Sequence, residues 1–181
     1  MMPTTQKQGV PSKKFGPKLL LGTAAAVALI VAFEGGKDKD GSSVAYADKL
    51  AGGLPTVCAG LTRHVTKTPI VVGERWSAEK CQREESAAIA KVQVQLEKCF
   101  GPVPPQSVFD AATSFAWNVG VPAACKSGAM QYWQRGDWRT GCNRMARSLS
   151  GKRVWVFSGG KFRQGLANRR DYEARYCLGG A

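Results

Sequence analysis

Six cysteines lie between residues 58 and 177, and none lies in the first 57 residues of this 181-residue chain. They are Cys58, Cys81, Cys99, Cys125, Cys142 and Cys177. No two have C-x-x-C spacing and the chain holds one histidine, so the pattern argues against a zinc site. An even number of cysteines, all following an apolar segment of the kind found in exported proteins (residues 19–33), indicates disulfides formed in an oxidising compartment. The alternative is a cytosolic protein with buried free thiols, and the spacing leaves the pairing open.

An apolar segment precedes these cysteines. Residues 1–18 are polar and basic, and the 15 residues 19–33 carry no charge. A basic flank before an apolar run predicts a cytoplasmic N-terminus. The run is shorter than the roughly 20 residues of a full membrane span, so a cleaved signal peptide, a permanent anchor and a weak, releasable anchor all remain open. Because the A-x-A pattern at 45–47 lies far beyond the run, we predict an uncleaved anchor unit at 1–33 and a second domain at 34–181.

The chain is strongly basic, with 26 Lys and Arg against 13 Asp and Glu and a net charge of +13. Such a surface attracts nucleic acid, anionic lipid or an acidic wall polymer. No nucleic-acid-binding motif or zinc-finger spacing is present, so we predict that nucleic acid is not the partner.

The region after residue 33 predicts an α+β fold. Two short strands at 44–48 and 55–60 are expected to form a hairpin, after a flexible loop or wide turn at 35–43. Residues 62–76 are expected to be irregular. Helices are expected at 77–99, 106–118, 128–134, 139–149 and 162–176, with a Gly-rich loop at 150–161. The apolar stripe of the 106–118 helix indicates that it is central and buried.

Two carboxylates and a hydroxyl follow the apolar run: Glu34, Asp48 and Thr56. Such a set can hydrolyse a glycosidic bond, because one carboxyl group protonates the leaving oxygen while the other stabilises positive charge on the sugar ring. The structural alternatives are a helix-terminal role for Glu34, an Asx turn at Asp48 and a plain strand position for Thr56.

Six stretches together resemble phage-type lysozymes, the endolysins of glycoside hydrolase family 24. They are residues 34–35, 45–48, 55–60, 77–81, 114–120 and 165–170. The last three, in this order and spacing, are the most specific. The Ala-rich N-terminus further resembles signal-anchor-release endolysins, which are held inactive at the inner membrane and released into the periplasm when the membrane potential collapses.

The resemblance implies a lysozyme-like fold with a small β-hairpin lobe, a mainly helical lobe and an N-terminal apolar helix. It also implies hydrolysis of the β-1,4 bond between N-acetylmuramic acid and N-acetylglucosamine in peptidoglycan, which lyses the host and releases phage. Glu34 matches the general acid, Asp48 the second carboxylate and Thr56 the hydroxyl that places the attacking water. Arg169 matches an arginine that pairs with the acid, and Trp117 an aromatic residue lining the substrate cleft. No cofactor or metal is implied, and a monomer is expected.

Three departures from the family pattern accompany this resemblance. The connections from Glu34 to Asp48 and from Asp48 to Thr56 are longer than usual, a change that loops absorb at little cost. Leu61 stands where a histidine is common, and His64 comes three residues later.

Two other functions are compatible with the same sequence. A lytic transglycosylase would act on the same polymer without a second carboxylate. An exported cationic wall-binding module would bind peptidoglycan without cutting it. In the predicted arrangement the catalytic domain is periplasmic, and residues 19–33 hold it at the host inner membrane until release.

Overall fold

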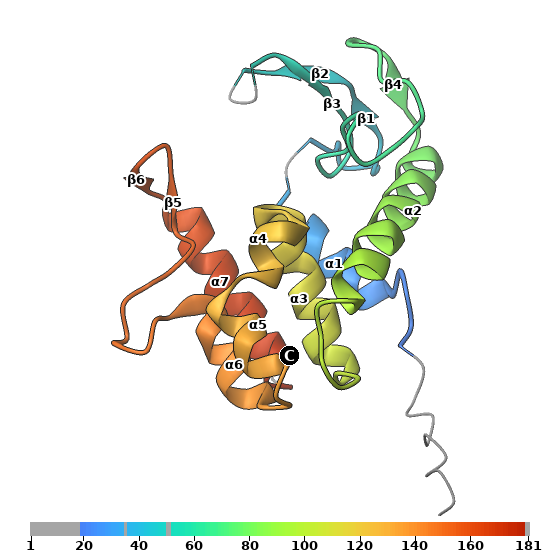
Figure 1. Ribbon diagram of the computed structural model, residues 1–181. Helices are drawn as coiled ribbons and strands as arrows, with labels where there is room; N and C mark the ends of the chain where they lie inside the picture. Colours follow the sequence, from blue (N-terminus) through green and yellow to red (C-terminus); the bar gives the residue numbers. More distant parts are fainter. Residues whose placement is uncertain (1–18, 35, 50–51, 180–181) are drawn as a thin grey trace, which may run out of the picture.

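The computed structural model of the chain describes residues 19–34, 36–49 and 52–179. Its elements are α1 (Ala24–Val31), β1 (Ser43–Val44), β2 (Tyr46–Asp48), β3 (Leu54–Thr56), β4 (Arg75–Trp76), α2 (Ala78–Glu97), α3 (Gln106–Val119), α4 (Val121–Cys125), α5 (Gly128–Trp133), α6 (Trp138–Ala146), β5 (Phe157–Ser158), β6 (Lys161–Phe162) and α7 (Gln164–Cys177). Strands β1–β4 gather at one end, α3–α7 form the other, and α2 runs between the two (Figure 1). The arrangement is α+β, as predicted.

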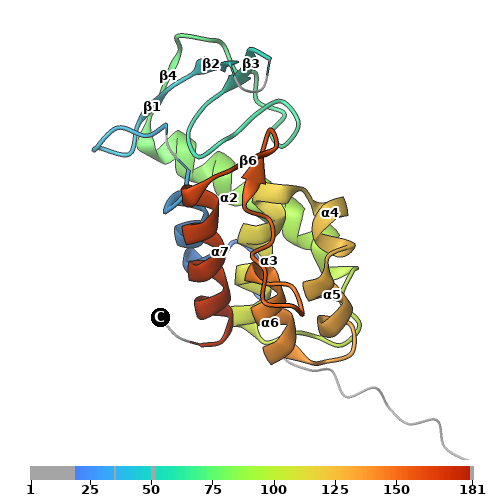
Figure 2. The same ribbon diagram turned by 90° about the vertical axis from the view of Figure 1, so that its left-hand side faces the viewer.

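Helix α3 is the centre of the helical lobe. Every residue from Val108 to Ala116 is buried, so the helix is covered all round rather than along one stripe. Helices α1, α2, α4, α6 and α7 all contact it, and Figure 2 shows α7 and α4 on either side of it. The prediction of a central, buried helix over 106–118 is therefore confirmed.

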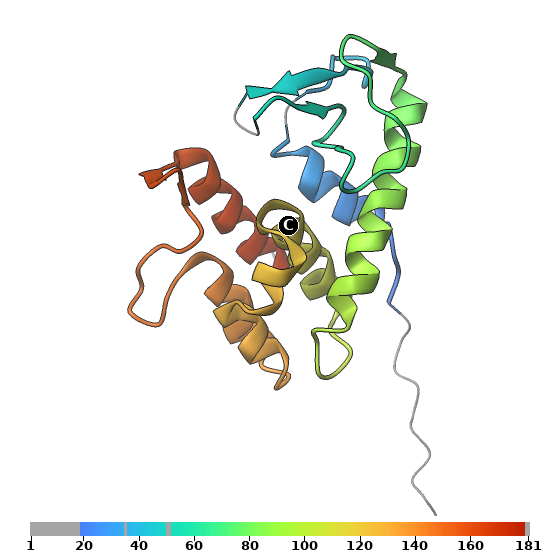
Figure 3. The ribbon, with the colours of Figure 1, turned by 45° about the horizontal axis from the view of Figure 1, so that its top comes forward.

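Helix α1 covers eight residues of the apolar run at 19–33. It begins at Thr23, whose Oγ1 accepts a hydrogen bond from the N–H of Ala26 at 3.0 Å, as an N-cap residue does. Ala26, Leu29 and Ile30 are buried, because α1 packs on α2 and α3 beneath the strands (Figure 3). Among the described residues, no helix combines the length and apolar character needed to cross a bilayer.

The β lobe consists of two antiparallel pairs, β1–β4 and β2–β3. The predicted hairpin is present as β2–β3, in which Tyr46 lies opposite Thr56 and Asp48 opposite Leu54. Its second strand ends at Thr56 rather than at residue 60, because residues 57–61 fold into a tight turn. Strand β4 lies in the stretch that we expected to be irregular. It forms by pairing with β1, more than 30 residues earlier in the chain.

The longer connection from Glu34 to Asp48 is taken up by an ordered turn and by strand β1. Arg75 Nη1 lies 2.6 Å from Asp38 Oδ2, and the N–H of Asp38 donates to the carbonyl of Ser42 at 2.8 Å. Of the two alternatives expected for 35–43, a flexible loop or a wide turn, residues 36–43 form the turn, and Arg75 of β4 binds it through Asp38 and Ser42.

All six cysteines form disulfides: Cys58–Cys81, Cys99–Cys125 and Cys142–Cys177. The first joins the β lobe to α2, the second joins the segment after α2 to α4, and the third joins α6 to α7. Helix α4 and the β5–β6 hairpin were not expected from the sequence, and the hairpin occupies part of the predicted Gly-rich loop.

Candidate active site

Glu34 lies just beyond the last turn of α1. Its N–H donates to the carbonyl of Ile30 at 3.2 Å, so the backbone of α1 sets its position. Its side chain is 24% exposed, and its Oε1 lies 2.7 Å from Nη1 of Arg169. A residue at the end of the first helix is thereby paired with one on the last helix.

Arg169 is held in place by contacts on several sides. Its side chain is only 3% exposed. Nε donates to Oε1 of Glu173 at 3.0 Å, and Nη2 donates to the carbonyl of Ser114 at 3.1 Å. The ring centroid of Phe33 lies 5.6 Å from the guanidinium carbon. The guanidinium is therefore oriented before any ligand arrives, and Arg169 is not a solvated charge on the surface of α7.

A buried ionic group supports this arginine from behind. Glu173 accepts from the hydroxyl of Ser114 at 2.6 Å and pairs with Arg170 at 2.9 Å. Burial raises the pKa of Glu173 and lowers the pKa of Arg170 to about 10, while the attraction between them opposes both shifts. Buried charges of this kind are tolerated because each is paired.

The β2–β3 hairpin carries Asp48 and Thr56 on the same face. Residues directly opposite on antiparallel strands share a face, as do residues two apart on one strand. Tyr46 lies opposite Thr56 and two residues before Asp48, so all three side chains belong to this face. Thr56 is buried, and its hydroxyl donates to the carbonyl of Leu54 at 3.0 Å.

Tyr46 links the two carboxylates electrostatically. Burial raises the pKa of its phenol, and the negative charges of Asp48 and Glu34 raise it further. Both carboxylates therefore act on the same side chain. Tyr46 lies within the 45–48 stretch and was not predicted as a site residue, although its spacing from Asp48 on a strand is a signal that could have identified it.

The turn at 57–61 lies against Glu34. Gly60 has a φ of +79°, and a Cβ there would lie 3.4 Å from Oε2 of Glu34 and 3.8 Å from Nε1 of Trp117. Trp117 is partly buried and packs against two apolar clusters. Trp117 thus combines packing against the core with proximity to Glu34.

Leu61, at the position where a histidine is common, closes this turn. Its backbone exchanges hydrogen bonds with Val57 at 2.9 and 3.0 Å, and its side chain is fully buried in the β-lobe core. The position is therefore apolar core here. His64 is exposed on the loop that follows. Within the described part of the chain, no cluster of three or more His, Cys, Asp or Glu side chains could hold a metal ion.

Comparison with known proteins agrees with this geometry. A family model described as phage lysozyme matches residues 34–173. The SAR-endolysins of Enterobacteria phages PA-2 and P21 are each 27% identical over 174 residues, covering 94% of this chain and 98% of each relative.

Solved structures share the fold. An endolysin from Escherichia coli O157:H7 phage FAHEc1 has a TM-score of 0.68 at 25% identity, covering 91% of this chain and 96% of its own. A P22 lysozyme variant has a TM-score of 0.72 at 19% identity, covering 88% and 99% of the two chains. The fold is thus the expected lysozyme-like one, with a helical lobe and small β-hairpins.

Proposed function

Because the chain belongs to the phage lysozyme family, we propose that Glu34 is its general acid and that residues 19–33 are a releasable membrane anchor. The protein is a glycoside hydrolase of the muramidase type that degrades peptidoglycan and lyses the host cell. The bond that fits this family joins N-acetylmuramic acid to N-acetylglucosamine. The matched residues, 34–173, contain every candidate catalytic and substrate-binding residue.

The ion pair between Arg169 and Glu34 is the observation that carries the assignment of the acid. Arg169 is fixed by Ser114 and Glu173, so it holds one oxygen of Glu34 in a defined orientation. The other oxygen, Oε2, faces the turn at Gly60. In the proposed reaction Glu34 gives a proton to the leaving glycosidic oxygen as the bond to the anomeric carbon breaks.

Asp48 and Thr56 complete the proposed reaction. Ionised Asp48 stabilises the positive charge that develops on the ring and takes the proton of the attacking water. The hydroxyl of Thr56 donates to the carbonyl of Leu54, so its lone pairs are directed to accept a hydrogen bond from that water. Trp117, next to Glu34, supplies an aromatic surface for a sugar.

Polar contacts at the start of α1 support the release proposal. The hydroxyl of Thr23 donates to Oδ1 of Asp110 at 3.0 Å, and the N–H of Gly22 donates to Oε1 of Gln93 at 2.7 Å. Ala26, Leu29 and Ile30 of the wholly apolar α1 are buried against the enzyme. A segment cannot occupy this site and a bilayer together, so we assign the packed arrangement to the released enzyme.

Activation follows from the same geometry. Glu34 is joined to α1 through only two residues, Ala32 and Phe33. Withdrawal of α1 into the inner membrane would therefore separate Glu34 from Arg169 and from the β2–β3 hairpin. In this proposal the tethered form is inactive, and release into the periplasm assembles the site.

The test of the acid compares wild type with Glu34→Gln and Asp48→Asn on permeabilised Gram-negative cells, measuring turbidity and new reducing ends. Glu97→Gln, an exposed carboxylate at the end of α2, is the control and should lyse normally. Lysis by Glu34→Gln would refute the assignment. Activity of Asp48→Asn with anhydro products would indicate a transglycosylase, and binding without reducing ends a non-enzymatic module.

Mass spectrometry and cell fractionation test the anchor. Collapsing the membrane potential should move the uncleaved chain from the membrane to the periplasmic fraction. A periplasmic form beginning at Asp48 would lack Glu34 and would contradict both the anchor and the acid.

A further inference from the structure

The turn at 57–61 follows Thr56 directly and lies beside Glu34, the proposed acid. Reciprocal backbone hydrogen bonds between Val57 and Leu61 close it. Gly60, near its end, is the residue whose Cβ position lies 3.4 Å from Oε2 of Glu34. A small displacement of this turn would therefore change the space around the proposed acid and the position of the proposed water-binding hydroxyl together.

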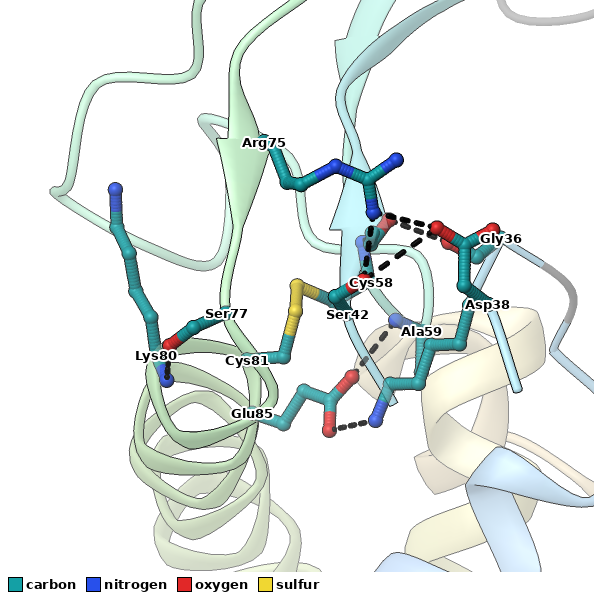
Figure 4. Close-up of a disulfide and its surroundings, with 12 residues drawn as sticks. Gly36, Asp38, Ser42, Cys58, Ala59, Arg75, Ser77, Lys80, Cys81 and Glu85 are labelled. Atoms are coloured by element: carbon teal, nitrogen blue, oxygen red, sulfur yellow. Dashed lines mark hydrogen bonds and ion pairs between the residues drawn. A yellow bond between two sulfur atoms is a disulfide. The ribbon is translucent and has the colours of Figure 1, made fainter. Parts of the chain in front are cut away.

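Helix α2 holds the turn at two adjacent residues. Cys58 is bonded to Cys81 by a disulfide, and the N–H of Ala59 donates to Oε1 of Glu85 at 2.8 Å. Cys81 and Glu85 are four residues apart, so they project from the same face of the helix. Figure 4 shows both side chains reaching from α2 to the turn.

Glu85 also binds the segment that follows the acid. Its Oε2 lies 2.7 Å from Nζ of Lys37, and the side chains are 2% and 21% exposed respectively. Lys37 comes three residues after Glu34. One buried carboxylate thus fixes the turn with one oxygen and the chain just beyond Glu34 with the other.

Ser43 of strand β1 makes a second link between the turn and the segment after Glu34. Its hydroxyl donates to the carbonyl of Gly36 and accepts the N–H of Cys58 at 2.9 Å. The backbone N–H groups of Cys58 and Ala59 are therefore both satisfied by side chains that also secure the segment after Glu34. Two independent bridges join the same two pieces of backbone.

We propose that Glu85, paired with Lys37, is a positioning residue that fixes the 57–61 turn relative to Glu34; this rests on the proposed function of Glu34. Stability alone does not explain the pair, since apolar residues of similar volume often replace a buried ion pair at no cost. A bidentate link between two backbone segments does explain it, because an apolar side chain would fill the space without fixing either segment.

The test measures kcat and KM on soluble glycan strands for the full chain and for Glu85→Gln, Glu85→Leu and Lys37→Met. Glu85→Leu should lose about 10- to 100-fold in kcat, the size expected for a misplaced catalytic group, with KM within about twofold of wild type. Glu85→Gln keeps an acceptor for Ala59 and should lose less. Glu84→Gln, the neighbouring carboxylate that binds Thr66 and Thr68, should retain wild-type kcat.

Circular dichroism at the assay temperature shows which variants are folded. Should Glu85→Leu not fold, the isosteric Glu85→Gln and Lys37→Met decide, and wild-type kcat in both folded proteins would overturn the proposal. Adding Glu85→Gln to Lys37→Met should recover activity by removing the unpaired buried charge. A folded Glu85 variant without an acceptor that keeps wild-type kcat would overturn the proposal, as would equal losses in Glu84→Gln. Activity in Glu34→Gln would refute the assignment of the acid instead, so the two failures are distinguishable.

Discussion

Two of the disulfides should contribute similarly to stability and differently to activity. Cys58–Cys81 and Cys142–Cys177 are both buried, with sequence separations of 23 and 35. The loop-closure relation gives roughly 3.4 and roughly 3.8 kcal/mol for the two cross-links at 25 °C. The double variants Cys58→Ala/Cys81→Ala and Cys142→Ala/Cys177→Ala should therefore lose nearly equal free energies of unfolding.

Their effects on catalysis should separate. Cys58 belongs to the turn that lies against Glu34, whereas Cys142 and Cys177 join α6 to the C-terminal end of α7. Loss of Cys58–Cys81 removes the covalent link between the turn and α2 and leaves the hydrogen bond from Ala59 to Glu85 and apolar packing, so we expect kcat to fall by about tenfold. Loss of Cys142–Cys177 should leave kcat within about twofold of wild type.

Guanidinium unfolding followed by far-UV circular dichroism gives the two free energies, and reducing-end release from soluble glycan strands gives kcat at 25 °C. Both measurements are made under conditions in which each variant is folded. Equal losses of kcat in the two variants, or none in either, would refute the claim that the turn determines catalytic geometry. A difference of several kcal/mol in stability would refute the loop-closure estimate.

Three further substitutions test other contacts. Gly60→Ala adds a Cβ at 3.4 Å from Glu34 Oε2 and places an alanine at φ +79°, so kcat should fall and the free energy of unfolding should decrease by about 1–2 kcal/mol. Gly160→Ala, at φ +72° with open space around it, should show the decrease in stability without the decrease in kcat. Arg169→Met removes one partner of a buried ionic group and should cost about 3 kcal/mol in guanidinium unfolding, with a loss of lysis. Burial raises the pKa of Asp110 above its ordinary 3.8, so its contribution to stability is complete below pH 3.8 and is lost as pH rises through the folded pKa. Asp110→Asn should therefore gain stability relative to wild type between pH 4 and pH 7 in urea unfolding.

Each of these has a contradicting result. Equal kcat in Gly60→Ala and Gly160→Ala would show that the contact with Glu34 is unimportant. An Arg169→Met protein as stable and as lytic as wild type would show that Arg169 supports neither stability nor catalysis. A stability difference between Asp110→Asn and wild type that does not change with pH would show that Asp110 does not titrate in that range.

Local sequence signals predicted the helices well. The helix expected at 77–99 is α2, which begins after Ser77, whose Oγ accepts the N–H of Lys80 at 3.2 Å as an N-cap. The apolar stripe of 106–118 indicated a buried helix, and the structure buries every residue from Val108 to Ala116, beyond that stripe. The hairpin expected from the two short strands at 44–48 and 55–60 is present as β2–β3.

Features that depend on distant partners were not predictable. Strand β4 exists because it pairs with β1, and the ordered turn at 36–43 depends on Arg75 of β4. Glu85 has the sequence context of an exposed helix residue, and only the fold brings Lys37 and Ala59 to it. Disulfide pairing likewise follows from tertiary proximity and not from spacing.

The candidate site shows the same division. Glu34, Asp48 and Thr56 were selected by residue type and by the family resemblance. The orientation of Arg169 toward Glu34 requires Ser114 and Glu173, which no local pattern connects to it. The catalytic roles of Glu34, Asp48 and Thr56 are therefore tested by activity measurements on variants.

The most direct measurement is the release of reducing ends from purified peptidoglycan by the released full-length chain and its Glu34→Gln variant. Both proteins should have the same circular dichroism spectrum. The wild type should release muramic-acid reducing ends, and Glu34→Gln should release none above the enzyme-free rate. Hydrolysis by a folded Glu34→Gln protein at the wild-type rate would contradict the central claim.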